Sequence, residues 1–447
     1  MAHRRSLSQS LVSCLGVVLL CVVLPHAAES AGQAVSRQAA GPNVSVGVTD
    51  YRSKNFLVHT DLPSAEAQRL LARLETMLGH MTRYWGRPNR KIVECYVVDR
   101  LTNWPTGAID PRALPSIRAN AGITLSGILT RGNRFSAKSR VYSVSRRGTP
   151  QHEAVHAYCM QTFGRTGPVW YSEGMAEVGN YWREKDSKAV HCNAIVVNYL
   201  RRSKPKAIHE IVQPRRPPRD SWQNYAWRWA LCHLLGNNPN YAPRFRPLGL
   251  ALLTGKPGVN FQRVYGPVSR EVAFEYLFFL QHLERGFRVD LCSWDWKAKY
   301  RIPRGGSSVT VPILAGRGWQ PSRLRVTRGG QYAYRAKGTW KTGSEEQPIS
   351  ADGRKDKTGR LMGIIFDDYT LSKPFEMGTY GTFTSPMDGK LLLRCRDRWN
   401  EIADNSGTIK LRLKIAGRGK PLSRPKQTGQ QDAGSSKTAT LKKRTDS

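Results

Sequence analysis

Two histidines and a glutamate occur within five residues near the middle of the chain, in the sequence HEAVH from 152 to 156. Residues four apart share one face of an α-helix, so His152 and His156 can bind one metal ion. Glu153 then projects beside them, where a carboxylate can take a proton from the water that the ion activates. Thr149 and Pro150, directly before the motif, are typical of a helix start. The motif therefore predicts a zinc site with Glu153 as the general base.

The third zinc ligand is expected from a second helix. Sixteen residues separate His156 from Glu173, which leaves room for the rest of one helix, a turn and the start of the next. A catalytic zinc takes three protein ligands and leaves one position open, and Glu173 would complete the set. Glu177, one helical turn later, can accept a hydrogen bond from the outer nitrogen of a zinc-bound histidine. A solvated or capping carboxylate is the alternative for Glu177.

Two further features bear on catalysis of this kind. Tyr225 is the candidate for stabilising an oxyanion, with a core tyrosine as the alternative. The segment Arg140–Ser145 alternates polar and apolar residues, as an exposed strand does. We expect this strand to be the sheet edge to which an extended peptide adds by backbone pairing, which favours a peptide or protein substrate.

The pattern resembles that of the gluzincin superfamily of metallopeptidases, in which a His-Glu-x-x-His helix is followed by a helix containing Glu-Gly-x-Ala. The second pattern is EGMA from 173 to 176 in this chain. More narrowly, residues 55–290 are similar to a largely uncharacterised bacterial family within that superfamily. The resemblance implies peptide-bond hydrolysis, and by matching motifs it assigns the three zinc ligands and the general base to His152, His156, Glu173 and Glu153.

The elements that must position these residues indicate a mixed α and β fold. Phe56–Val58 and Lys91–Val98 are strand candidates, and between them residues 65–84 carry leucines and methionines at helical spacing. From Thr149 to about Leu283 the signals are helical. We therefore expect an α+β, gluzincin-like metallopeptidase domain over residues 51–298, with a sheet half followed by a helical half.

Beyond residue 300, short alternating runs separated by glycine-containing turns predict an all-β sandwich over residues 299–415. One of its loops concentrates four oxygen donors in an otherwise basic domain. Such a set suits Ca²⁺, which takes six to eight oxygen ligands, and a polar loop with a tight turn is the alternative. The candidate calcium ligands are Asp397, Glu401, Asp404 and Asn405.

This carboxy-terminal segment resembles the calcium-dependent galactose-binding lectins of the PA-I type, which are small β-sandwiches. The matching stretches are residues 334–340, 360–365, 374–378 and 391–407. The resemblance implies calcium at Asp397, Asp404 and Asn405, with a backbone carbonyl near Thr342 as a further ligand. Glu401 stands where the lectin has a threonine. Sugar-contacting residues outside the loop do not align, so a structural or docking module is an alternative to sugar binding.

Both ends of the chain read as segments outside the folded domains. Residues 1–30 combine a basic start, an apolar run and small residues, as an export signal does, and residues 31–50 read as a flexible leader. Nothing later approaches the roughly 20 apolar residues of a membrane span. Residues 416–447 form a basic, polar tail that we expect to be disordered. We expect an exported protein, periplasmic or extracellular.

Charge and cysteine content leave more alternatives open. The 70 Lys and Arg residues against 33 Asp and Glu give a formal charge of +37, which can attract anionic polysaccharide, while solubility alone is the alternative. No zinc finger, RNA-recognition motif or helix-turn-helix pattern is found in the sequence, which argues against a nucleic-acid partner. Disulfides and free buried thiols are equally open for the six cysteines that follow the predicted signal.

Three classes of function remain. The first is a secreted zinc metallopeptidase that carries a calcium-dependent, carbohydrate-binding-like domain. The second is a noncatalytic protein in which the same fold keeps a structural zinc, and the third is a secreted glycan-binding adhesin with a peptidase-like scaffold. Glu153 favours the first class over the second, because a purely structural site does not need a general base. We therefore predict a zinc-dependent peptidase.

Overall fold

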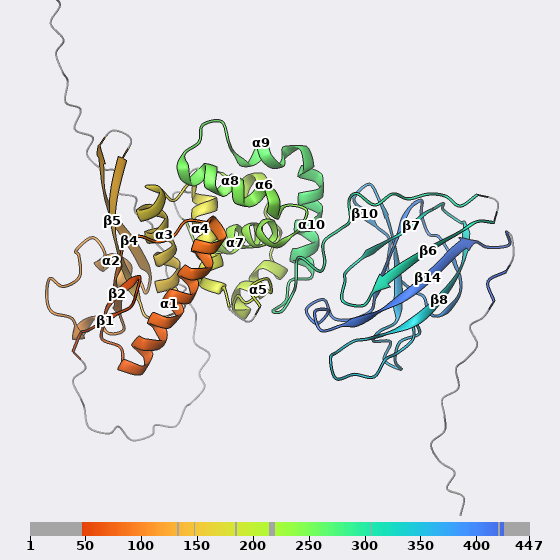
Figure 1. The fold of residues 1–447 in the computed structure, drawn as a ribbon, viewed down its shortest axis with the longest axis horizontal. Coiled ribbons are helices and arrows are strands. Elements are labelled where there is room, and N and C mark those ends of the chain that lie inside the picture. Colours follow the sequence, from red (N-terminus) through yellow and green to blue (C-terminus); the bar gives the residue numbers. More distant parts are fainter. Residues whose placement is uncertain are drawn as a thin grey trace, which may run out of the picture. The chain divides into compact units, whose positions relative to one another are not determined.

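The computed structural model divides into two compact units, which are described separately (Figure 1). It describes residues 47–131, 134–146, 148–183, 186–213, 220–304, 306–418 and 421–423. The first unit extends to Trp296 and includes the short segments 316–319 and 397–404, and the second takes 297–315, 320–396 and the chain from 405 onward. The predicted export signal, nearly all of the predicted leader and most of the predicted tail lie outside the described residues.

A five-stranded sheet forms the amino-terminal part of the first unit. Its strands are β1 (Thr49–Arg52), β2 (Phe56–Thr60), β3 (Val93–Val98), β4 (Gly122–Arg131) and β5 (Arg134–Val144). Their order is β1-β2-β3-β5-β4, with parallel pairing of β2 to β3 and β3 to β5 and antiparallel pairing elsewhere. The expectation that Arg140–Ser145 forms the sheet edge is wrong, because Arg140 of β5 pairs with Glu94 on one side and Leu125 on the other. The edge strands are β1 and β4.

Helices cover this sheet and form the rest of the first unit (Figure 1). They are α1 (Ser64–Trp85), α2 (Leu114–Arg118), α3 (Thr149–Phe163), α4 (Val169–Tyr181), α5 (Ala194–Arg202), α6 (Ile208–Ile211), α7 (Trp222–Asn237), α8 (Ala242–Thr254), α9 (Phe261–Tyr265) and α10 (Ser269–Gln281). Two 3₁₀ turns, Leu101–Asn103 and Gly266–Val268, accompany them. The helix predicted over residues 65–84 is α1, whose Leu70, Leu74 and Met81 are buried against the core.

Helix α3 lies in the centre of the first unit and packs against β4, β5, α1 and α4. Gly148 precedes it with a φ of 72°, a left-handed conformation that glycine adopts without strain, and Pro150 stands in its first turn. Residues 149 to 161 of this helix are all buried, polar ones included. Buried polar side chains must find partners inside the protein, so α3 is where a site is expected.

The second unit is all β and contains two antiparallel sheets. One has the order β10-β9-β13-β7 with β11 paired to β9, and the other has the order β12-β8-β14-β6. The strands are β6 (Ser308–Leu314), β7 (Gln320–Val326), β8 (Gln331–Lys341), β9 (Leu361–Asp367), β10 (Thr370–Leu371), β11 (Phe375–Glu376), β12 (Tyr380–Thr384), β13 (Gly389–Cys395) and β14 (Ser406–Ile415). Leu391 of one sheet and Ile409 of the other belong to the same buried core. A mixed α+β chain with a separate β part is therefore confirmed.

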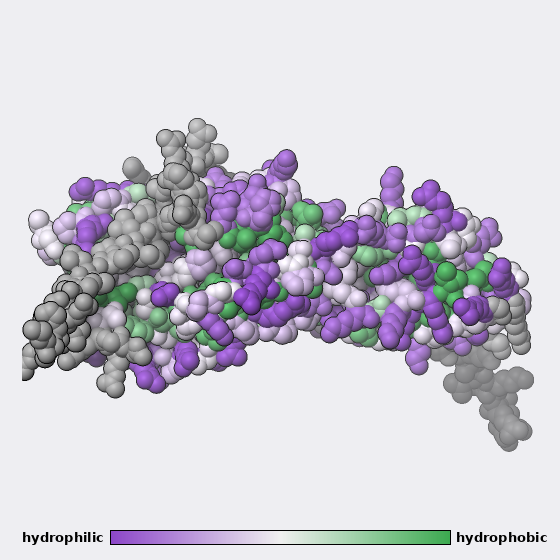
Figure 2. Space-filling view, turned by 90° about the horizontal axis from the view of Figure 1, so that it is seen from above, coloured by the Kyte–Doolittle hydropathy of each residue, from purple (hydrophilic) through white to green (hydrophobic). Residues whose placement is uncertain are grey.

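Cys95, Cys159, Cys192 and Cys232 are free and buried, and Cys292 and Cys395 are buried as well. Burial raises the pKa of Cys95, Cys159, Cys192 and Cys232, because a thiolate is poorly solvated in the core. No helix in the described part of the chain is long and apolar enough to span a membrane. The face of the molecule in Figure 2 is covered mainly by hydrophilic side chains, between which the hydrophobic patches are small.

Candidate metal centre

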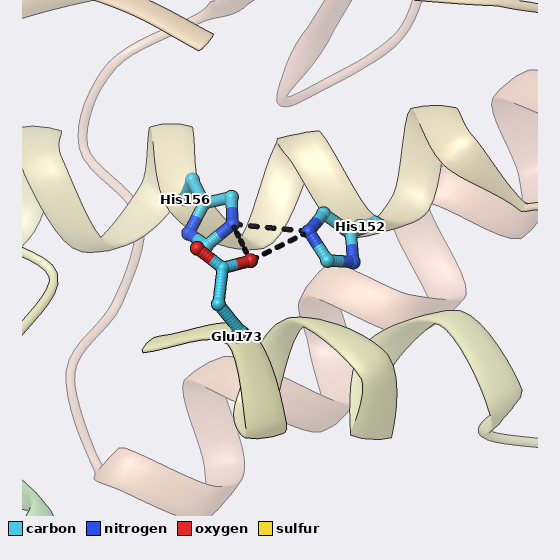
Figure 3. A group of neighbouring side chains, drawn as sticks. All are labelled: His152, His156 and Glu173. Carbon is cyan, nitrogen blue, oxygen red and sulfur yellow. Dashed lines mark hydrogen bonds and ion pairs between the residues drawn. The ribbon is translucent and has the colours of Figure 1, made fainter. Parts of the chain in front are cut away.

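Helices α3 and α4 bring together the three residues that the sequence predicts as zinc ligands (Figure 3). His152 and His156 stand one turn apart on α3, and Glu173 reaches them from α4. The Nε2 atoms of the two histidines lie 3.1 Å apart, and Oε2 of Glu173 lies 3.2 Å from the first and 3.4 Å from the second. All three residues are buried, with at most 2% of their surface exposed. Together they could bind a metal ion.

The spacing of these three atoms fits zinc coordination. Zinc binds nitrogen and oxygen ligands at about 2.0–2.2 Å in a tetrahedral arrangement, which places the ligand atoms roughly 3.3–3.6 Å from one another. The three observed separations, 3.1, 3.2 and 3.4 Å, are close to that range. Two imidazoles and one carboxylate form a donor set found in catalytic zinc sites, where a fourth position stays open.

The outer nitrogens of both histidines have partners that fix the rings. Nδ1 of His152 lies 2.9 Å from Oε1 of Glu177, as predicted, and the other oxygen of Glu177 accepts a hydrogen bond from Asn180. Nδ1 of His156 lies 3.2 Å from Oγ of Ser172, a contact that sequence reasoning missed. Such partners select the tautomer that presents Nε2 to a metal. No spacing in the sequence pointed to Ser172, although it directly precedes the predicted ligand Glu173.

Glu153 projects from α3 toward strand β4 and is fully buried. Oε2 of Glu153 lies 2.8 Å from the hydroxyl of Thr124, whereas Oε1 has no hydrogen-bond partner within the described chain. Gly122 on the same strand allows this close approach, since a Cβ there would lie 2.7 Å from Cγ of Glu153. Sequence reasoning missed Thr124 and Gly122, because it did not recognise β4 as a strand. One oxygen of Glu153 is thus held and the other is left available.

The electrostatics of the centre favour a bound positive charge. Burial alone would lower the pKa of His152, but hydrogen bonds to Glu173 and Glu177 outweigh burial and raise it well above the usual value. Burial would likewise raise the pKa of Glu173, but the neighbouring His156 and His152 hold it well below the usual range. Burial raises the pKa of Glu153, which makes this carboxylate a stronger base than an exposed glutamate.

Tyr225 lies beside the centre on helix α7. Its side chain is buried, and its ring centroid is 6.0 Å from that of His152. The guanidinium of Arg228 lies 5.5 Å from the tyrosine ring and is itself held by an ion pair of 2.7 Å with Asp220. Tyr225 is therefore a neighbour of His152. Its role in stabilising an oxyanion stays a prediction.

A cavity of about 340 Å³ lies beside the carboxy-terminal half of α3. Met160, one helical turn beyond His156, lines it together with Ile128 of the edge strand β4 and Leu252 of α8. The loop between α3 and α4, residues 164–168, completes the wall. An apolar side chain could fill this space.

The predicted calcium ligands lie in the loop between β13 and β14 and at its end. Within the described chain, Asp397, Glu401 and Asp404 do not form a group whose ligand atoms lie within 4.8 Å of one another. Oδ1 of Asp397 accepts a hydrogen bond from the backbone of Arg398, whose guanidinium forms a 2.9 Å ion pair with Glu401. Asn405 is buried. Calcium binding by these four residues stays a prediction.

The likenesses found among known proteins are to solved structures. No protein-family model matches the chain, and no curated protein matches it. A solved structure described as "EclA N-terminal domain; PllA-like lectin" matches with 16% identity over 25% of this chain and 99% of that chain, with a TM-score of 0.21. The function is therefore argued from the site itself.

Proposed function

We propose that the first unit is a zinc-dependent metallopeptidase. The observation that carries this proposal is the mutual approach, to 3.1–3.4 Å, of three buried ligand atoms from His152, His156 and Glu173. Two histidines and one carboxylate also bind Fe(II) in oxygenases. A glutamate directly after the first ligand, with one carboxylate oxygen without a partner, favours hydrolysis over oxygen chemistry.

Each residue of the site has a distinct role in hydrolysis. A zinc ion held by His152, His156 and Glu173 would supply Lewis-acid chemistry, which lowers the pKa of water and polarises a carbonyl. Glu153 accepts a proton from the attacking water through Oε1 and returns it to the leaving amine. Burial raises the pKa of Glu153, which makes it a stronger base for this step. Thr124 holds the other oxygen of Glu153 and so fixes the direction of the carboxylate. Tyr225 is proposed to donate a hydrogen bond to the oxyanion.

The proposed substrate is an extended peptide. Strand β4 lies at one edge of the sheet and carries Gly122 and Thr124, which lie against Glu153. A peptide that pairs with β4 would therefore pass next to the general base. The cavity beside Met160 and Ile128 would then receive an apolar side chain of that peptide. Export of the chain, Ca²⁺ binding by the loop from Asp397 to Asn405, and glycan binding by the carboxy-terminal β-sandwich stay proposals from the sequence.

The test combines metal content with turnover. Elemental analysis of the wild type should find one zinc per chain, which the double variant His152→Ala, His156→Ala should lose and an exposed-histidine control, His209→Ala, should keep. Glu153→Gln should retain zinc and cleave a mixed peptide library about 10²–10⁴ times more slowly. A wild type without zinc, or a Glu153→Gln variant that cleaves as fast as the wild type, would overturn the proposal.

A further inference from the structure

One face of the second unit carries an uncompensated group of cations. In the sheet β12-β8-β14-β6, alternate residues enter the core and the others point outward. The outward residues include Arg335, Lys337 and Lys341 on β8, and Lys410 and Arg412 on β14. We call these five residues the basic sheet face. Strands β8, β14 and β6 lie side by side in this unit (Figure 1).

The strand register places like charges directly opposite one another. Lys337 pairs with Lys410, and Arg335 pairs with Arg412. Directly opposed like charges on one face of a sheet destabilise the pairing. Two such pairs in succession are therefore unfavourable for folding alone, which points to a role in binding.

Carboxylates do not neutralise this face within the described chain. None of its five cations forms an ion pair with a described residue, and the outward positions of the four strands hold no aspartate or glutamate. Arg412 donates a hydrogen bond to Ser308, and Arg335 donates one to Ser423. Lys337, Lys410 and Arg412 are exposed to solvent. The face thus has cations available to an external anion.

We propose that the basic sheet face binds an anionic polysaccharide through its sulfate or carboxylate groups. On β8 the cations extend from Arg335 to Lys341, about 20 Å at roughly 3.4 Å per residue, and Lys410 and Arg412 lie beside them on β14. This length suits a linear polymer better than a single small anion. Thr339 and Thr408, paired beside Lys337 and Lys410, add hydroxyl groups that can bond to sugar oxygens. The proposal is independent of the zinc site in the first unit.

A polysaccharide suits this face better than a nucleic acid. Proteins that bind single-stranded nucleic acid stack successive bases on several aromatic rings. Among the outward side chains of this sheet the aromatic one is Tyr380, at the end of β12, whereas threonines occupy positions on all four strands. The face therefore offers charge and hydroxyl groups with little stacking surface.

The experiment measures retention of the full chain on dextran sulfate against uncharged dextran over a salt gradient. The variant Lys337→Gln, Lys410→Gln removes one opposed pair. A matched control, Lys355→Gln, Lys373→Gln, removes two exposed charges elsewhere in the second unit. For nucleic acids, each cation that neutralises a polymer anion adds roughly 0.7–0.9 to the slope of log affinity against log salt concentration. Removing such a cation lowers the slope by the same amount. The test variant should therefore lose between one and two units of slope and elute at lower salt, while the control elutes near the wild type.

A charge-preserving variant and a competing polymer complete the test. Lys337→Arg, Lys410→Arg should be retained like the wild type, since the charges remain. Equal losses in the test and control variants would show that overall charge alone causes retention and would overturn the proposal. Tighter binding of DNA than of dextran sulfate at equal ionic strength, with the same dependence on Lys337 and Lys410, would also overturn it in favour of nucleic acid.

Discussion

The glycine at position 122 offers a way to disturb the general base while leaving the zinc ligands intact. In the variant Gly122→Ala, the new Cβ would lie 2.7 Å from Cγ of Glu153 and 2.7 Å from Cγ2 of Thr149. Carbon atoms in ordinary contact are about 3.5–4.0 Å apart, so the overlap approaches roughly 1 Å. Both contacted residues belong to α3, so rotating one side chain does not relieve the clash with the other. Strand and helix must separate, or Glu153 must move.

The size of the effect follows from this overlap. A misplacement of about 1 Å in a catalytic group costs on the order of 100-fold in rate, and overpacking a tight core costs about 1–3 kcal/mol of stability. We expect Gly122→Ala to keep its zinc, to lower kcat/KM for a fixed peptide about 100-fold and to lower Tm. Zinc content, initial rates and thermal unfolding measure the three quantities.

The same strand supplies the control. A Cβ at Gly127 would meet no atom within 4 Å. Gly127→Ala should therefore keep zinc, rate and stability close to those of the wild type. The reasoning is refuted if Gly122→Ala matches Gly127→Ala in both Tm and turnover, because the close approach of β4 to Glu153 would then be unnecessary. The comparison of the two Tm values does not depend on any substrate.

Two further predictions concern the metal and the pH. Glu177→Gln should weaken zinc binding about 10–100-fold in a chelator competition, because it replaces the carboxylate that holds Nδ1 of His152; unchanged affinity would contradict the assigned role. Burial lowers the pKa of His80 and His233 to about 4, so both are neutral in the folded state above that pH. As the pH falls from 6.5 to 4, the unfolded chain binds protons that the folded chain does not, and each histidine lowers the free energy of unfolding by as much as about 3 kcal/mol. Urea unfolding at pH 7 and pH 4.5 should show this loss, and His233→Gln should reduce the difference; an equal difference in that variant would exclude His233 as a cause.

The convergence of His152, His156 and Glu173 could be predicted from the sequence, because helical geometry converts short spacings into positions. His152 and His156 are four residues apart, and so are Glu173 and Glu177, so each pair shares a face of its helix. The ligand set and the partner of His152 followed from those spacings. A serine beside a predicted ligand carries no comparable signal, because its rotamer decides whether it reaches His156.

The strand order and the calcium loop show the limit of this reasoning. Strand β5 alternates polar and apolar residues, yet it is paired with a strand on both sides. Arg140 lies on one face of the sheet, where it forms an ion pair with Glu94 of the neighbouring strand. Alternating polar and apolar residues show that the two faces of a strand have different surroundings. They do not show which strands lie beside it in the sheet. Oxygen donors close in sequence, such as Asp397 and Glu401, likewise converge only if the loop backbone turns them inward.

Four buried thiols, those of Cys95, Cys159, Cys192 and Cys232, link the stability of the fold to its resistance to oxidation. Oxidation and disulfide exchange proceed through the thiolate, and burial suppresses that form at four of the cysteines. The folded chain therefore resists oxidants for as long as it remains closed, and damage proceeds through transient opening. These four cysteines are therefore protected by the stability of the fold around them.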